Sequence, residues 1–199
     1  MTGKAPELWH AETGMKEKVS YRMEGSETVV PLTLAPDESV HVVFREDTQQ
    51  ASMTVTKPAK VELGQIDGKW NVAFQKDRGA PAKAVFDTLV PLDEHADDRI
   101  KYFSGIATYS NRFETPKGWK RGDPLWLDLG EAKEVAEVKV NGKLAGYSWH
   151  APYRLDISEV AKPGKNTLEI RVANLWVNRM IGDKQPGAEP VTWAGVPTY

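Results

Sequence analysis

Alternation of apolar and polar residues dominates this chain, and the spacing typical of helices is nearly absent. Val138 and Val140 have the two-residue spacing of side chains on one face of a strand. Asn141-Gly142 follows them and supplies the positive φ angles that a two-residue hairpin turn needs. We therefore expect sheets joined by short turns.

After residue 60 the alternation predicts seven to nine strands, and a short piece at 156–161 is the best helical candidate. So many short strands with tight connections indicate a β-sandwich, with Tyr153 among its core residues. The most distinct strands are expected at 68–74, 84–89, 100–113, 125–129, 153–157 and 167–175.

The segment before residue 60 has a different character. Residues 29–34 and 39–44 predict a β-hairpin around the turn Ala35-Pro-Asp-Glu38. Residues 46–59 are polar, include Lys57-Pro58 near their end and predict a linker or crossover. We expect two domains: residues 1–56 as a partial β-domain or hairpin, and residues 61–199 as the sandwich.

Composition excludes several classes of partner and chemistry. Lys plus Arg number 26 and Asp plus Glu 28, a net charge of −2 that gives no reason to expect nucleic acid or an acidic membrane surface. The absence of cysteine excludes disulfides, thiol catalysis and cysteine-ligated zinc. No apolar run reaches the ~18–20 residues that span a bilayer, and the first residues lack the pattern of a signal peptide. Both ends are abrupt, so we expect a fragment of a larger protein.

Sequence signatures of catalysis are also missing. No G-x-S-x-G nucleophile elbow, phosphate-binding loop or dinucleotide fingerprint occurs. The four histidines have no spacing that indicates a metal site. Asp128, Asp156, Glu169 and Asp183 lie in or beside predicted strands, where solvent-facing or turn-capping roles are favoured over glycosidic acid–base chemistry.

Four motifs in a fixed order resemble a known family. Trp126-Leu-Asp-Leu-Gly130, Val138-Lys-Val-Asn-Gly142, Pro152-Tyr-Arg-Leu-Asp-Ile157 and Pro163-Gly-Lys-Asn-Thr-Leu-Glu-Ile170 are similar to the galactose-binding-like jelly roll of large glycoside hydrolases, the sugar-binding domain of family 2 enzymes. The resemblance covers roughly residues 61–182. It implies an all-β jelly-roll sandwich, preceded here by the partial β-domain.

A narrower resemblance concerns the parent protein. Residues 174–183, with 101–105 upstream, are similar to the C-terminal part of family 106-type α-L-rhamnosidases. The resemblance implies that the catalytic carboxylates lie on a (β/α)₈ barrel of the parent chain, which would be a partner of this domain. It also implies an extracellular or periplasmic bacterial parent, and no hydrolysis by this chain alone.

Sugar binding is the chemistry that the residues favour most. Aromatic rings stack on the apolar face of a pyranose, and Asn and Arg side chains satisfy its hydroxyl groups. The candidates form two clusters, at 149–154 and 174–179, which would meet on one rim if the strands pair in motif order. The alternative roles of these residues are core packing, surface ion pairs or contact with a neighbouring domain. The candidate ligand-binding residues are Trp149, His150, Arg154, Asn174, Trp176, Asn178 and Arg179.

Calcium is a second possible ligand, because jelly rolls of the resembled kind often hold it. The candidate carboxylates are Asp93, Asp97 and Asp98, in an acid-rich loop that otherwise is simply solvated. Three functions stay open: a non-catalytic carbohydrate-binding accessory module, a purely structural domain packed on the catalytic barrel, and an autonomous enzyme with paired carboxylates. The first is favoured over the second, and the third has least support.

Overall fold

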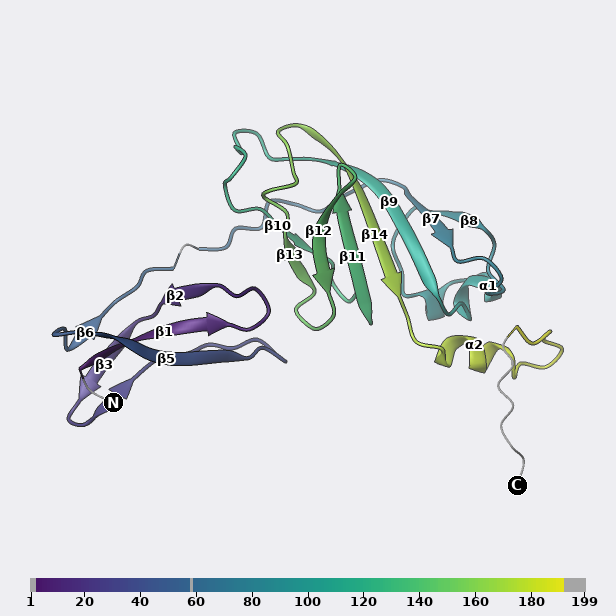
Figure 1. Cartoon of the computed structure of the whole chain (residues 1–199). Coiled ribbons are helices and arrows are strands. Elements are labelled where there is room, and N and C mark those ends of the chain that lie inside the picture. Colours follow the sequence, from purple (N-terminus) through teal and green to yellow (C-terminus); the bar gives the residue numbers. More distant parts are fainter. Residues whose placement is uncertain (1–2, 58, 192–199) are drawn as a thin grey trace, which may run out of the picture. The chain divides into compact units, whose positions relative to one another are not determined.

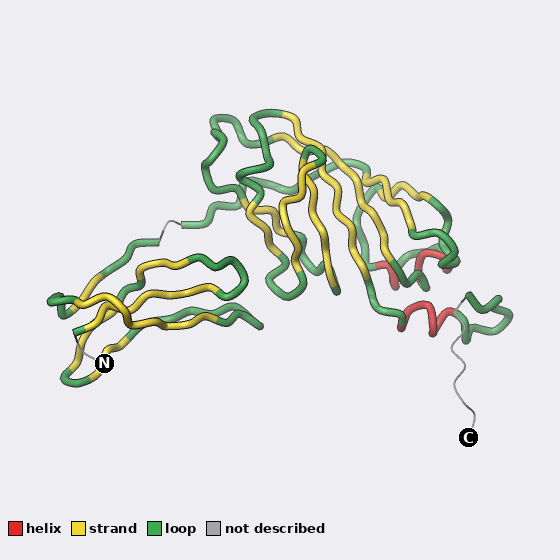
Figure 2. The backbone as a smooth tube through the Cα atoms, viewed as in Figure 1, coloured by secondary structure: helices red, strands yellow, loops and turns green. Residues whose placement is uncertain are grey.

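The computed structural model describes residues 3–57 and 59–191, which form two compact units, Met1–Glu62 and Leu63–Tyr199. Strands and loops make up nearly all of both units, and helices are confined to short pieces of the second (Figures 1 and 2). None of the helices in the described part is long and apolar enough to span a membrane.

The first unit consists of two small antiparallel sheets, with strand orders β2-β1-β5 and β4-β3-β6. Its buried apolar side chains among the described residues are few: Leu8, Val19 and Tyr21. The strands are β1 (Lys4–His10), β2 (Lys16–Lys18), β3 (Tyr21–Glu24), β4 (Glu27–Val29), β5 (Val40–Asp47) and β6 (Ser52–Met53).

The predicted hairpin of residues 29–34 and 39–44 is wrong. Val29 ends β4, the residues from 30 to 39 form no strand, and β5 pairs with the distant β1. Pro31 and Pro36 have no N–H to donate to a ladder, which explains why this stretch does not continue as a strand. Alternation predicted strand β5 but not its partner.

The second unit holds eight strands in the part that the structure describes, and confirms the all-β fold. Its six-stranded sheet has the order β12-β11-β14-β9-β7-β8, and β10 pairs with β13 in a second, two-stranded sheet (Figure 1). The strands are β7 (Trp70–Phe74), β8 (Lys83–Phe86), β9 (Ile106–Glu114), β10 (Trp126–Asp128), β11 (Val135–Val140), β12 (Lys143–Ser148), β13 (Arg154–Asp156) and β14 (Lys165–Ala173).

The core lies on one face of the large sheet. Along β11, Ala136, Val138 and Val140 are fully buried, while the residues between them are not. Leu127 of β10 and Ile157, which follows β13, belong to the same apolar cluster. The two sheets therefore enclose one core. Tyr153 is 7% exposed, as expected of a core residue.

The helical predictions need correction. Residues 157–161 form a single turn that does not continue as a helix: as expected, the Asp156 carboxylate caps it by accepting from Ser158 N at 2.9 Å, and Ala161 N donates to Ile157 O at 2.9 Å. The strand expected at 100–113 begins only at Ile106, because Asp97 caps a helix that takes up its first residues. The helices are η1 (Leu92–Glu94), α1 (Asp98–Lys101) and α2 (Val177–Gly182).

Candidate functional site

The pairing of the large sheet brings two predicted clusters to one edge. Strands β12 and β14 both run antiparallel to β11, so they are parallel to each other and end at the same side. Ala136 pairs with Ser148 at the end of β12 and with Val172 near the end of β14. Two strand spacings amount to about 10 Å, a distance that one oligosaccharide can bridge. We call residues 149–153 and 174–182 the rim.

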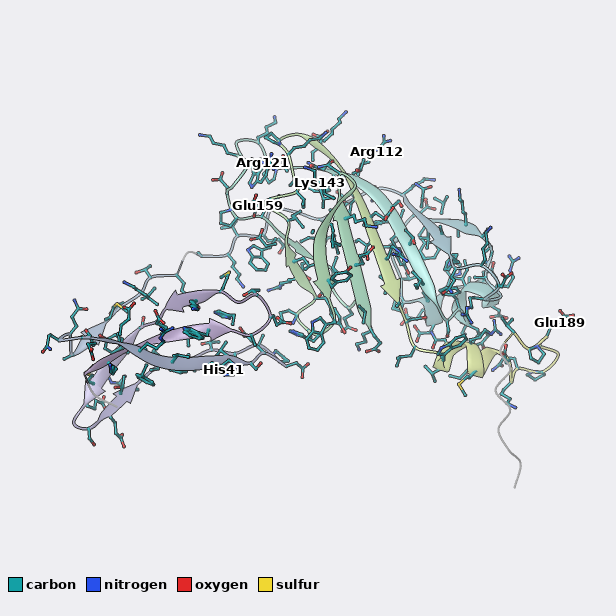
Figure 3. All side chains as sticks on the ribbon, in the orientation of Figure 1. His41, Arg112, Arg121, Lys143, Glu159 and Glu189 are labelled. Atoms are coloured by element: carbon teal, nitrogen blue, oxygen red, sulfur yellow. The ribbon has the colours of Figure 1, made fainter. Side chains whose placement is uncertain are left out.

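The opposite end of the sandwich carries a different set of side chains. Figure 3 labels Arg112, Arg121, Lys143 and Glu159 there, where β9 ends and β12 begins. Arg121 donates from Nη2 to the Glu159 carbonyl oxygen at 3.1 Å. None of the predicted ligand-binding residues comes from this end, so the rim is the face to examine.

Trp149 is the most exposed large apolar side chain of the rim, and the half-buried His150 lies against it. Trp149 is 61% exposed, directly after the buried Ser148 that ends β12. The His150 ring meets the indole edge-to-face, with centroids 4.8 Å apart and planes at 88°. Because a carbonyl oxygen can only accept, His150 Nδ1 donates to Ala151 O at 2.7 Å, which fixes its orientation. An oriented, solvent-facing indole is suited to stacking on a sugar ring.

Arg154 lies on the outer face of the small sheet, paired with Asp128 across the strands. Its Nε donates to Asp128 Oδ2 at 2.7 Å, and Asp128 Oδ1 accepts from Gly130 N at 2.9 Å. Burial alone would raise the pKa of Asp128, but the Gly130 and Arg154 hydrogen bonds lower it below its ordinary value. One donor of Arg154 is therefore committed to an ion pair.

Asn174 has a structural contact at each end of its amide. Its Oδ1 accepts from Gly105 N at 2.8 Å, and its Nδ2 donates to Phe103 O at 2.9 Å. These bonds tie the end of β14 to the loop that leads into β9. In this arrangement the amide holds the rim together and is not directed to solvent.

Trp176 and Asn178 follow on the same segment. The Arg78 guanidinium lies 4.4 Å from the centroid of the Trp176 ring, a cation–π contact that covers part of an indole otherwise 47% exposed. Asn178 is half-buried in the first turn of α2.

Arg179 is enclosed and paired. Its side chain and that of Asp183 are each 8% exposed, and Nε lies 2.8 Å from Asp183 Oδ1. The contact is an ion pair, because the Nε–H is not aligned for a hydrogen bond. A methyl group added at Gly79 or Gly182 would come within 2.9 or 2.5 Å of the guanidinium, so the two glycines make room for it. A buried arginine in this position holds the segment in place.

Tyr147 lies on β12 beside the rim, and sequence reasoning did not single it out. It is 55% exposed and stands two positions before Trp149, with the buried Ser148 between them. The period-two rule, applied from Tyr147 to Trp149, was the signal that places both on one side of the strand. The pair extends the aromatic surface of the rim along β12.

The three calcium candidates lie in η1 and at the start of α1. Asp97 offers both carboxylate oxygens to Arg99, accepting from Nε at 3.0 Å and from Nη2 at 2.7 Å. Among the described residues no three His, Cys, Asp or Glu side chains gather in a way that could hold a metal ion, whereas calcium requires six to eight oxygens. Asp93 and Asp98 are exposed, and calcium binding by the three aspartates stays a prediction that this arrangement does not favour.

Comparison with known proteins agrees with this architecture. The family described as "Glycosyl hydrolase 2 galactose-binding domain-like" matches residues 91–197. The chain belongs to this family. The predicted resemblance to the galactose-binding-like region of large glycoside hydrolases is confirmed.

Two relatives have this domain within much longer chains. A solved structure titled "Structure of Rhamnosidase from Novosphingobium sp. PP1Y" is 54% identical with a TM-score of 0.91, covering 100% of this chain and 19% of that one. A protein of Formosa agariphila named "Putative beta-glucuronidase" is 33% identical over 193 residues, 84% of this chain and 16% of its own. The present chain spans less than a fifth of either relative's length.

Proposed function

We propose that this chain is a non-catalytic accessory module of a larger, α-L-rhamnosidase-like glycoside hydrolase, and that it binds carbohydrate at the part of the rim formed by residues 149–153. The observation that supports binding is Trp149, 61% exposed directly after the edge strand β12 and in edge-to-face contact with the His150 ring. The parent activity is supported by the 54% identity to the rhamnosidase.

The proposed contacts divide between stacking and hydrogen bonding. The indole of Trp149 and the ring of Tyr147 present apolar surface to the C–H face of a pyranose. The ring of His150 and the remaining donors of Arg154 supply polar contacts to hydroxyl groups. Asn174 and Arg179 take no direct part, because their polar atoms hold the rim together.

The same proposal places the chemistry elsewhere in the longer protein. The acid and base carboxylates are assigned to a catalytic barrel outside this chain, against which the module packs. An extracellular or periplasmic location follows from the family, since such enzymes act on sugars outside the cytoplasm. Within this chain the module positions substrate and performs no bond cleavage.

Calorimetric titration of the chain with rhamnose, galactose and pectic oligosaccharides tests binding, with calcium or EDTA as a further variable. We expect saturable heat with at least one sugar, and Trp149→Ala to weaken it at least about tenfold, or ~1.4 kcal/mol. Trp126→Ala is the matched control, since Trp126 is 57% exposed but lies on β10 of the small sheet. An equal loss of sugar affinity in both variants would contradict a site at Trp149. A loss of sugar affinity in EDTA would support the prediction that calcium binds.

A purely structural domain is the second candidate function. It is favoured by the exposed apolar side chains of the segment at α2. Flat titrations with a folded chain would support this alternative, because the domain would then bind no sugar of its own.

A further inference from the structure

Helix α2 has its polar and apolar sides reversed relative to an ordinary surface helix. Arg179 and Gly182, three positions apart, are its buried residues. Val177, Met180 and Ile181 have the spacing of one helical face and are 52%, 45% and 49% exposed. A surface helix normally buries its apolar stripe against the core, so this helix presents that stripe outward.

Two residues before the helix enlarge the exposed surface. Leu175 is 57% exposed and Trp176 47% exposed. Five of seven consecutive positions therefore carry large apolar side chains in contact with solvent. We call Leu175, Trp176, Val177, Met180 and Ile181 the α2 face. Soluble monomers rarely expose contiguous apolar patches above a few hundred Å² unless the patch is an interaction site.

The orientation of α2 is determined by polar contacts on its inner side. Arg179 N donates to the buried Ser104 Oγ at 2.9 Å, and the guanidinium of Arg179 is accommodated by Gly79 and Gly182. Asn174 secures the start of the segment through Phe103 and Gly105. Turning the helix to bury its apolar stripe would break these contacts and expose a paired arginine. The outward direction of the stripe is thus a property of the packed fold.

Local sequence does little to stabilise the helix. It has six residues, far below the ~12–15 at which isolated helices become stable, and Trp176 at its N-cap makes no side-chain cap hydrogen bond. Such a helix gains most of its stability from tertiary packing. Its inner side already packs on the sandwich, so an apolar partner on the outer side would complete its burial.

We propose that the α2 face is the docking surface for an apolar surface of another domain of the same longer polypeptide. The inference rests on the proposed function for the existence of that polypeptide, and it names the surface used. The occupant is indicated by length: this chain matches 19% of a rhamnosidase chain at 54% identity, so most of such a protein lies outside it. The five residues carry no charge, so the surface they fit is apolar.

Hydrogen–deuterium exchange compares α2 in the 199-residue chain with α2 in the longer polypeptide. Covering the face should slow exchange of the α2 amides at least about tenfold in the longer polypeptide. Ile181→Asp should abolish this slowing, because the new carboxylate would be buried against apolar surface. In the 199-residue chain the same substitution is exposed and should move Tm by no more than about 2 °C.

Leu144→Asp is the matched control. Leu144 is 48% exposed against 49% for Ile181, and it lies on β12 instead of α2. The control should retain the slow exchange of α2 in the longer polypeptide. Loss of slow exchange in both variants would overturn the proposal, because general destabilisation would then explain the result.

Other occupants give distinguishable results. A concentration-dependent dimer of the 199-residue chain that Ile181→Asp abolishes would assign the face to a second copy and overturn the proposal. Faster α2 exchange in a chain ending at Val191 than in the full chain would assign it to residues 192–199 and overturn it as well. Sugar titration is independent of both, so flat titrations with a protected α2 would remove the rim proposal and leave this one standing.

Discussion

Asn166 is the buried polar residue on which the end of the sandwich opposite the rim depends. It is 2% exposed, and its Nδ2 donates to Lys162 O and Gly164 O, both at 2.8 Å. Its Oδ1 accepts from Lys162 N at 2.9 Å and from Asn141 Nδ2 at 2.8 Å. Two donors and two acceptor positions are all satisfied, so the side chain joins the β11–β12 turn to the turn before β14.

Replacing Asn166 with Leu should destabilise the chain by about 2–4 kcal/mol, because several buried backbone and side-chain groups would lose their partners at once. Urea unfolding monitored by tryptophan fluorescence gives the difference. Asn71→Ala serves as control: Asn71 is exposed on β7, and its loss should cost within about 0.5 kcal/mol. Equal midpoints for the two variants would show that the buried network adds no stability.

At the scale of elements, β10 and β13 are each three residues long, and their one cross-strand ion pair in the described structure is Arg154–Asp128. The folded pKa of Asp128 is lower than its ordinary value, so the pair stabilises above that ordinary pKa and is lost as pH falls through the folded pKa. Both side chains are partly exposed, at 42% and 53%, so the contribution at pH 7 is at most about 1 kcal/mol.

Asp128→Asn should therefore lower the urea midpoint at pH 7, and the gap to the unmodified chain should narrow as pH falls below the ordinary pKa of aspartate and close once pH is below the lower folded pKa. Unfolding titrations at several pH values measure the gap. Asp93→Asn, at an exposed carboxylate of η1, should show little gap at neutral pH. A gap for Asp128→Asn that stays constant down to pH 3 would mean that protonation of Asp128 is not involved.

At the scale of elements, apolar–polar alternation predicted the strands that bury one face. Strand β7 was expected over residues 68–74 and begins two residues later, at Trp70, and the turn at Asn141-Gly142 has φ angles of 53° and 75° as its residue types indicated. Alternation does not indicate which strand pairs with which when the partners are distant in sequence, as β1 and β5 are. Helix α2 escaped prediction because it has only six residues and no N-cap side chain marks its start.

The candidate site was predictable only at the level of position. The order of strands brought Trp149 and Trp176 to one edge, as expected if the motifs pair in sequence. Sequence could not reveal that the Asn174 amide is used inside the fold, because its bond to Phe103 joins positions 71 residues apart. Arg179 pairs locally with Asp183, but it is held inside the fold through its backbone N–H, which donates to Ser104 75 residues away. Polar residue type alone does not distinguish a ligand contact from an internal one.

At the scale of the whole molecule, the two units differ in how much core each has. The apolar cluster of the second unit is drawn from residues 66–172 alone, and includes large side chains such as Trp70 and Phe103. The described part of the first unit buries only three large apolar side chains on two small sheets. Small chains bury a lower fraction of their surface on folding, so the first unit should be the less stable.

A chain that begins at Leu63 should fold alone, because its core is complete without residues 1–62. Its free energy of unfolding should stay within about 0.5 kcal/mol of that of the second unit in the full chain. In the full chain the first unit should lose its protection against hydrogen exchange at lower urea. Peptide-resolved exchange mass spectrometry over a urea series follows both units in one experiment. Simultaneous loss of protection, or a lower midpoint for the shortened chain, would mean that residues 1–62 stabilise the sandwich. The division into two units would then describe its contacts and not its energetics.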